Sequence, residues 1–155
     1  MQKLDSLNQV ADFHKTFGAP ILPNPTIPNA DRCALRVSLL SEELDELKEA
    51  IVANDLVEIA DALCDLQYVL SGAVLEFGLG ERFVDLFNEV QRSNMSKACQ
   101  SLVEAEQTVK FYLDKDGTEA EIVEENGLWK VYRKSDNKVL KSINYSPADL
   151  VSLLK

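Results

Sequence analysis

Six acidic side chains are the residues of this chain best suited to carry out chemistry. They form two groups of three: Glu42, Glu43 and Glu46, and then, after a short gap, Glu58, Asp61 and Asp65. Carboxylates in apolar surroundings are costly unless something cationic holds them. Carboxylate oxygens are also the ligands that hard divalent ions such as Mg²⁺ or Mn²⁺ prefer. If the two groups face each other they form a site for such ions, which points to phosphate chemistry.

The second group lies on a stretch that is otherwise uncharged. From Leu56 to Leu75 its three members are the only charged residues, and a helix that is apolar all round is a buried helix. At ~100° per residue, the three acids fall within roughly 60° of arc. The pattern therefore predicts one stripe of carboxylates on a helix that is buried everywhere else.

The first group lies on the preceding predicted helix, where it covers roughly 100° of arc. The break around Asn54 is only a residue or two long, so we expect the two helices to pack as an antiparallel hairpin. Glu46 then comes opposite Asp61, and Glu43 opposite Asp65. Carboxylates that converge in this way repel one another strongly in a low-dielectric site, and a bound Mg²⁺ or Mn²⁺ would remove the conflict.

Simpler explanations exist for each part of this pattern. The run from Glu42 to Glu49 is typical of a solvated helix face, where Glu–Lys pairs add only ~0.3 kcal/mol each. Glu58 could complete a capping box with Asp55, and Asp65 could pair with a lysine or arginine. None of these explains why a buried helix keeps all its acids on one stripe, so we prefer the metal interpretation.

The elements that must position these acids are mainly helical. Apolar spacing and turn residues predict four helices, at about 4–17, 31–53, 55–77 and 83–94, with a proline-rich extended loop at 19–29. After Cys99 the pattern predicts a helix from Leu102 to Asp116, a β-hairpin turning at Asn126-Gly127, a short strand at Val139–Lys141, and a helix that starts at Ser146-Pro147. We therefore expect an antiparallel helical bundle core at 1–98, a small α+β appendage at 99–141, and a C-terminal tail with a short helix at 142–155.

Composition limits the possible functions. The formal net charge of −10 argues against a protein that binds a nucleic-acid polymer through a basic face. Three cysteines without metal-ligand spacing indicate reduced thiols rather than disulfides. The N-terminus does not have the pattern of a signal peptide and no apolar run reaches the ~20 residues of a membrane span. We therefore expect a cytoplasmic protein without membrane contact.

The two acidic groups together resemble the motif pair of the all-α nucleoside triphosphate pyrophosphohydrolases, EExxE on one helix and ExxD on the next. In this chain they are Glu42-Glu43-Leu44-Asp45-Glu46 and Glu58-Ile59-Ala60-Asp61. The superfamily includes MazG, the dimeric dUTPases and phosphoribosyl-ATP pyrophosphohydrolase. Residues 89–97 and 138–147 also resemble segments of MazG-like members, so the likeness covers about 1–98 and the tail.

The resemblance implies Mg²⁺-dependent hydrolysis of a nucleoside triphosphate between the α and β phosphates, the reaction of a hydrolase acting on acid anhydrides. It implies metal ligands at Glu43, Glu46, Glu58, Asp61 and Asp65. For the catalytic group that orients the attacking water, the resemblance implies Glu42 or Glu43. Relatives are dimers or tetramers, so a homodimer or homotetramer is expected. No motif indicates which nucleotide base the enzyme prefers in its substrate.

Few cations are placed to bind a phosphate tail. Arg92 and Lys97 flank Asn94 just after the fourth predicted helix, and we predict that these three residues bind substrate, although polar caps or turns are equally consistent with them. Arg32 and Arg36 could clamp phosphates, but pairing with acids of their own helix is the simpler expectation. His14, the only histidine, is expected to pack or to stack on a base rather than to act as a catalytic base.

Two alternative functions follow from the same residues. One is a phosphoribosyl-ATP pyrophosphohydrolase of histidine synthesis, against which the 99–141 appendage argues because that enzyme is usually compact. The other is a non-catalytic helical interaction module whose acids bind a basic partner. Such a module would need no metal and would tolerate Asp61→Asn.

Overall fold

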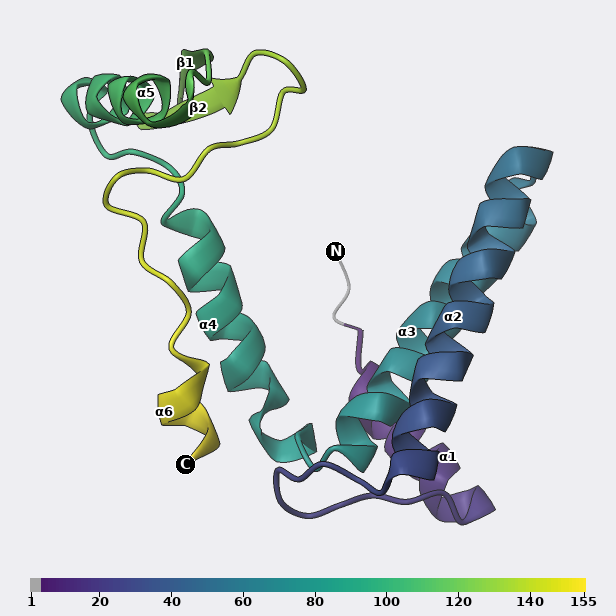
Figure 1. Cartoon of the computed structure of the whole chain (residues 1–155). Coiled ribbons are helices and arrows are strands. Elements are labelled where there is room, and N and C mark those ends of the chain that lie inside the picture. Colours follow the sequence, from purple (N-terminus) through teal and green to yellow (C-terminus); the bar gives the residue numbers. More distant parts are fainter. Residues whose placement is uncertain (1–3) are drawn as a thin grey trace. The chain divides into compact units, whose positions relative to one another are not determined.

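The structure is a computed structural model that describes residues 4–155 of the chain. It divides into two compact units, Met1–Phe83 and Val84–Lys155. The first unit is helical, and the second combines helices with a two-stranded antiparallel sheet (Figure 1). This confirms the predicted fold class, a mainly α protein with a small α+β appendage on its C-terminal side. Among the helices in the described residues, none taken alone has the length and apolar character of a membrane span; two segments separated by a bent break, Leu56–Glu76 and Gly80–Met95, reach that threshold only as a pair.

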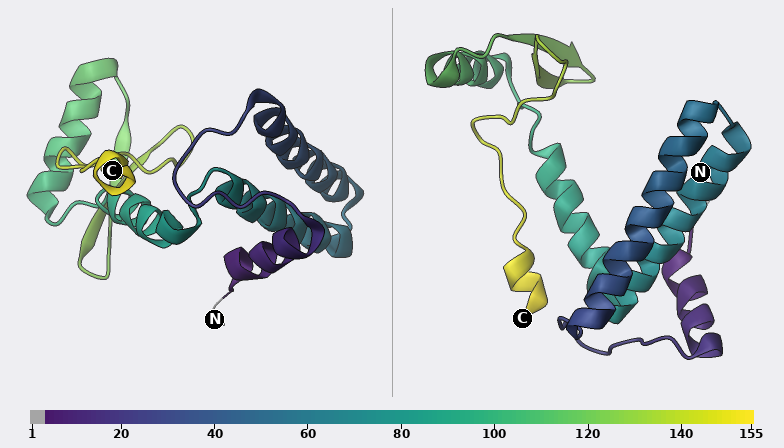
Figure 2. Two further views of the ribbon diagram at one scale, coloured as in Figure 1. Left: turned by 90° about the horizontal axis from the view of Figure 1, so that it is seen from below. Right: turned by 45° about the vertical axis from the view of Figure 1, so that its right-hand side comes forward.

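The first unit consists of three helices and a short 3₁₀ turn. These are α1 (Ser6–Phe17), α2 (Ala30–Ala53), α3 (Leu56–Glu76) and η1 (Gly80–Arg82). Helices α2 and α3 run antiparallel and side by side, and α1 packs on α3 (Figures 1 and 2). The predicted helical hairpin is therefore confirmed.

Local residue chemistry explains where the hairpin turns. Asn54 ends α2 in the left-handed conformation at φ 55°, which Asn tolerates better than most residues. The Asp55 side chain then accepts hydrogen bonds from the backbone N–H groups of Val57 and Glu58, as an N-cap does. These two residues are the whole connection between the antiparallel helices α2 and α3.

A buried ionic cluster fastens α2 to the far end of α3. Arg32 and Arg36 of α2 both donate to the carboxylate of Glu76, whose side chain is 1% exposed. The prediction that these arginines pair within their own helix is wrong, because Glu76 lies in the next helix. The alternative that they clamp phosphates is also unsupported, since the same carboxylate holds both guanidinium groups. Gly72 makes room for the cluster: a Cβ there would lie 2.7 Å from a terminal nitrogen of Arg36.

Helix α3 is less buried in this chain than its composition predicts. Ala62 and the residues from Ser71 to Glu76 are buried, but Leu56 and Val57 at the other end are 78% and 75% exposed. The prediction of a helix buried everywhere except along its acids therefore holds only for the C-terminal turns of α3. The physical reason is that α1 and the 19–29 loop contact α3 at its middle and C-terminal turns, where Gln67 donates to the Ser6 hydroxyl and Leu22 N–H donates to the Leu75 carbonyl.

The second unit contains the remaining elements. They are α4 (Phe83–Met95), which begins at the junction, α5 (Leu102–Asp116), β1 (Ala120–Glu125), β2 (Leu128–Arg133) and α6 (Leu150–Leu154). Helix α5 packs on the hairpin around a core formed by Cys99, Ala105, Val131 and Leu140. Asn126 and Gly127 both have positive φ, at 56° and 78°, as the predicted two-residue turn requires.

Two predictions for the second unit are wrong in detail. The segment Val139–Lys141 is not a strand but forms one isolated bridge, between Tyr132 and Val139. Helix α6 begins at Leu150 with Asp149 as its N-cap, and not at Ser146. The reason for the later start is that the backbone of Ser146 already exchanges hydrogen bonds with the side chain of Ser96, the residue after α4.

Candidate metal centre

Glu43 is the half-buried member of the six predicted acids, and it lies on the side of α2 that faces α3. Burial raises the pKa of its carboxyl group above the ordinary value, and the negative charges of Glu46, Asp65, Glu42 and Asp61 raise it further. Two of those neighbours, Asp61 and Asp65, belong to α3. The negative charges of both helices therefore act on one side chain, as expected for the predicted hairpin pairing.

The other five predicted acids are exposed to solvent. This follows from their positions beside the hairpin seam rather than within it, where Ala50 and Ala62 are buried instead. A cation or a phosphate group can therefore reach these carboxylates directly from the solvent.

A hollow of about 480 Å³ lies where α2 turns into α3, and carboxylates line most of it. Two of them, Glu46 and Glu58, are predicted metal ligands. The other two, Glu49 and Asp55, were not among the predicted site residues. The spacing of Glu49, three residues after Glu46, is a signal that could have identified it, because such residues are neighbours on a helix.

The alternatives to a metal site can be compared with these contacts. Asp55 does cap α3, but its own N–H donates to the Ala50 carbonyl, so Glu58 does not complete a capping box. Within residues 4–155, none of the six predicted acids has an ion pair with lysine or arginine. The exposed pair on this stretch of α2 joins Lys48 to Asp45, which is not one of the six.

The fit to a divalent ion is good in residue type but incomplete in geometry. In the described part of the chain, no three His, Cys, Asp or Glu side chains lie close enough together to hold a metal ion. Oxygen donors on two packed helices, without paired cations, are nevertheless the donor set that Mg²⁺ and Mn²⁺ use.

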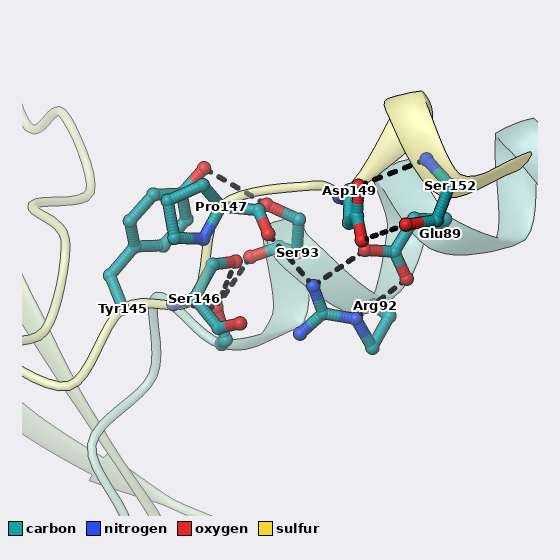
Figure 3. A network of polar contacts seen from close by, with 9 residues as sticks. Glu89, Arg92, Ser93, Tyr145, Ser146, Pro147, Asp149 and Ser152 are labelled. Atoms are coloured by element: carbon teal, nitrogen blue, oxygen red, sulfur yellow. Dashed lines mark hydrogen bonds and ion pairs between the residues drawn. The ribbon is translucent and has the colours of Figure 1, made fainter. Parts of the chain in front are cut away.

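The predicted substrate-binding residues Arg92, Asn94 and Lys97 all lie in the second unit. Arg92 donates twice to Glu89, with both N–O distances 2.7 Å, and its guanidinium group also donates to the Pro147 carbonyl (Figure 3). The Lys97 ammonium donates to the Asn94 side-chain oxygen at 2.7 Å. The structure thus brings these residues into contact with α4 and the C-terminal tail, and their binding of substrate stays a prediction.

His14 is buried in α1, and a carbonyl group holds its ring. Its Nδ1 lies 2.8 Å from the Pro20 oxygen, which can only accept, so Nδ1 carries the proton of this hydrogen bond. Its Nε2 lies 3.4 Å from Arg36. This placement agrees with the packing role that the sequence favours.

Comparison with known proteins connects the hairpin to a family. The sequence model of the phosphoribosyl-ATP pyrophosphohydrolase family matches residues 10–94, more than half of the chain, and the matched region contains both acidic groups. The chain is also 22% identical to an uncharacterized protein of Acanthamoeba polyphaga mimivirus, in an alignment that covers 99% of this chain and 97% of the viral protein.

Proposed function

Because the chain belongs to the phosphoribosyl-ATP pyrophosphohydrolase family, we propose that it hydrolyses a nucleoside triphosphate to the nucleoside monophosphate and pyrophosphate with Mg²⁺ or Mn²⁺ as cofactor. Membership of the family indicates pyrophosphohydrolase chemistry on a nucleotide. The choice of substrate and the need for a metal ion are the further steps of this proposal.

The observation that carries the proposal is the position of Glu43, which is half-buried and under the negative charge of acids from both helices. Its neighbours Asp61 and Asp65 come from the facing helix, and burial and these charges together raise the pKa of the Glu43 carboxyl. A fold that needed these acids only for solubility would gain nothing from placing one of them, half-buried, opposite two others. A role in binding a cation explains why the chain keeps this electrostatically unfavourable arrangement of acids.

We assign the metal ligands to five of the acids, from both helices: Glu43, Glu46, Glu58, Asp61 and Asp65. When bound, the divalent ion supplies positive charge that neutralises the charge developing on the phosphate oxygens during hydrolysis. Glu42, exposed and next to Glu43, is the acid outside this set, and it orients the attacking water and accepts its proton. Glu43 is the alternative residue for that role.

A second substrate has support of its own, since the matching family is named after phosphoribosyl-ATP. The same ligands would serve either substrate, because both reactions break an α–β phosphoanhydride bond. The α+β appendage at 99–141 lies outside the residues that match the family model. This addition to the family's matched region favours a substrate other than phosphoribosyl-ATP.

We further propose that the chain acts as a homo-oligomer. Apolar side chains are exposed along both helices of the hairpin, among them Leu35, Val37, Leu44, Val52, Leu56, Val57 and Leu63. Exposed apolar surface that gathers in a patch marks a protein contact site. A second copy of the chain covers it best, since its own hairpin presents the same apolar surface. Sedimentation velocity would give the mass, and a monomer at micromolar concentration would contradict this part.

The decisive experiment measures pyrophosphate release by the purified chain. The substrates are a panel of standard and modified nucleoside triphosphates and phosphoribosyl-ATP, each with Mg²⁺, with Mn²⁺ and with EDTA. We expect release from at least one substrate, only with metal present, and a loss of at least about 100-fold in Glu46→Gln and in Asp61→Asn. Asp45→Asn is the matched control, because Asp45 lies in the same motif but pairs with Lys48.

Circular dichroism must show that each variant keeps its helix content. Release from no substrate would overturn the enzymatic proposal. Full activity of Asp61→Asn, or activity in EDTA, would overturn the assignment of the metal site and favour the non-catalytic interaction module.

A further inference from the structure

The second unit contains a hollow of about 410 Å³ beside the β-hairpin, and its polar lining is mostly cationic. Four basic side chains line it: Lys97, Arg133, Lys138 and Lys141. Asp116 is the one carboxylate in the lining. The lining therefore has a formal excess of three positive charges, in a chain whose net charge is −10.

The negative groups near this hollow are already engaged. Asp116 accepts hydrogen bonds from the backbone N–H and the hydroxyl of Thr118, and these contacts lower the pKa of its carboxyl. Asp136, outside the hollow, accepts from Nε of Arg133 at 2.9 Å and from the backbone N–H of Lys138 at 3.1 Å. These carboxylates hold the backbone around the hollow. Among the side-chain nitrogens of the four basic residues, the contacts of these carboxylates use Nε of Arg133 and no other.

The cations themselves are available for a ligand. Among the described residues, Lys138 and Lys141 have no ion pair with a carboxylate. The ammonium of Lys141 lies 4.2 Å from the ring centre of Tyr145, a contact that holds it in place without neutralising it. The ammonium of Lys97 donates to a neutral amide oxygen, that of Asn94.

The walls of the hollow are rigidly connected. Arg133 N–H donates to the Lys138 carbonyl at 2.9 Å, and Leu140 N–H donates to the Val131 carbonyl at 2.8 Å. Val131 and Leu140 belong to the buried core of the second unit. The side chains that line the hollow therefore project from a backbone that is fixed by its own hydrogen bonds, and not from a loose surface loop.

We propose that this hollow binds a phosphate-bearing small molecule. Its volume is in the range of small-molecule sites, roughly 300–1,000 Å³. Lysine and arginine are the side chains that bind phosphate oxygens best, by charge and by directed N–H groups. Tyr112 and Val139 complete the lining with apolar surface against which a base or sugar can pack. The hollow lies outside the residues matched by the family and belongs to the second unit, whereas the acidic hairpin belongs to the first, so this proposal does not rest on the proposed function.

The phosphate groups can come from a nucleotide or from free pyrophosphate, and calorimetry distinguishes the two. The titrations use full-length Asp61→Asn chain in EDTA, so that neither metal binding nor hydrolysis at the hairpin contributes. The probes are inorganic pyrophosphate, an α,β-methylene nucleoside triphosphate, and the same nucleoside without phosphates. We expect both phosphate-bearing probes to bind and the bare nucleoside not to bind. Tighter binding of the nucleotide analogue would identify a nucleotide as the ligand, and equal binding would identify the phosphates alone.

Two double variants test the location of the site. Lys138→Gln with Lys141→Gln removes two cations of the hollow, and we expect the Kd to rise by about tenfold or more. Lys130→Gln with Lys134→Gln removes the same charge from β2 and the residue after it, where both lysines pair with glutamates, and it leaves the Kd unchanged. Binding of no phosphate-bearing probe would overturn the proposal. An equal loss in both double variants would also overturn it, because that would mean a general effect of net charge.

Discussion

Arg36 of α2 and Glu76 of α3 are 40 residues apart in the sequence and form a buried ion pair. Both side chains are almost fully enclosed, at 9% and 1% exposure. Burying one charge without its partner is far more costly than burying the pair. The pair, together with Arg32, therefore ties the start of α2 to the end of α3 and sets the alignment of the two helices that carry the acids.

Removal of the Glu76 carboxylate is predicted to destabilise the first unit. In Glu76→Gln, Arg32 and Arg36 keep their charges but lose their partner, so we expect a loss of about 3–5 kcal/mol in the free energy of unfolding. Denaturation in urea, followed by circular dichroism, measures this loss. The control Asp45→Asn removes an exposed pair with Lys48 and should cost about 1 kcal/mol or less. Equal effects of the two substitutions would contradict a stabilising role for the buried cluster.

Gly78, just after α3, is predicted to be irreplaceable for a steric reason. Its φ is +67°, and a Cβ there would lie 1.9 Å from the Asn24 carbonyl oxygen. Gly18 has a similar φ of +72°, but a Cβ there meets none of the described atoms within 4 Å. We expect Gly18→Ala to cost about 1–2 kcal/mol from backbone strain alone, and Gly78→Ala to cost about 2–5 kcal/mol in all. Thermal unfolding of the two variants separates backbone strain, which both share, from the steric overlap with Asn24, which only Gly78→Ala has. Equal shifts in Tm would show that the steric overlap has no effect.

Glu89 of α4 is predicted to make attachment of the C-terminal tail sensitive to acid. Its hydrogen bonds with the Arg92 guanidinium, and then with the Asp149 N–H, lower the pKa of its carboxyl to about 2 (Figure 3). A folded-state pKa below the ordinary 4.5 means that Glu89 stabilises the attached tail above about pH 4.5. This contribution is lost as the pH falls toward 2.

Nuclear magnetic resonance can follow this titration directly. We expect the Glu89 carboxyl carbon to titrate near 2, and the protection of the Asp149 amide against hydrogen exchange, relative to an unstructured chain at the same pH, to fall over the same range. Arg92→Gln should move the titration toward 4.5, since it removes the main cause of the shift. A midpoint near 4.5 in the unaltered chain would contradict the hydrogen-bonded arrangement.

Glu43 is predicted to couple stability to pH and to divalent ions. Its folded-state pKa is raised, so its ionised form opposes folding, and stability falls as the pH rises above its ordinary value of 4.5. At pH 7 in EDTA, Glu43→Gln should therefore raise the Tm slightly. Mg²⁺ at 100 times its Kd should stabilise the unaltered chain by about 2.7 kcal/mol and the variant by clearly less. Differential scanning fluorimetry measures both effects, with Asp45→Asn as control; an equal gain from Mg²⁺ in Glu43→Gln would contradict a ligand role for Glu43.

Much of the fold could be predicted from the sequence because its determinants are local. Asn54 and Asp55 end one helix and start the next through their own backbone preference and side-chain cap. Asn126-Gly127 turns the β-hairpin for the same kind of reason. The stripe of acids on each helix likewise follows from helical periodicity, which needs no knowledge of the partner helix.

Contacts between distant residues could not be predicted in this way. The sequence could not indicate that Arg32 and Arg36 meet Glu76, because the pairing depends on how α2 and α3 align along their length. It could not place the start of α6 either, since Arg92 of α4 and Ser96 just after it hold the backbone of Pro147 and Ser146.

The sequence by itself therefore determined the helical hairpin and the identity of its six acids. Only the tertiary structure decided that Glu43 is the one that is half-buried among the others, and that Asp55 lies with Glu46 and Glu58 in one hollow. The physical reason is that periodicity assigns a residue to a face of its helix, whereas burial and charge crowding depend on which part of the neighbouring helix packs against that face.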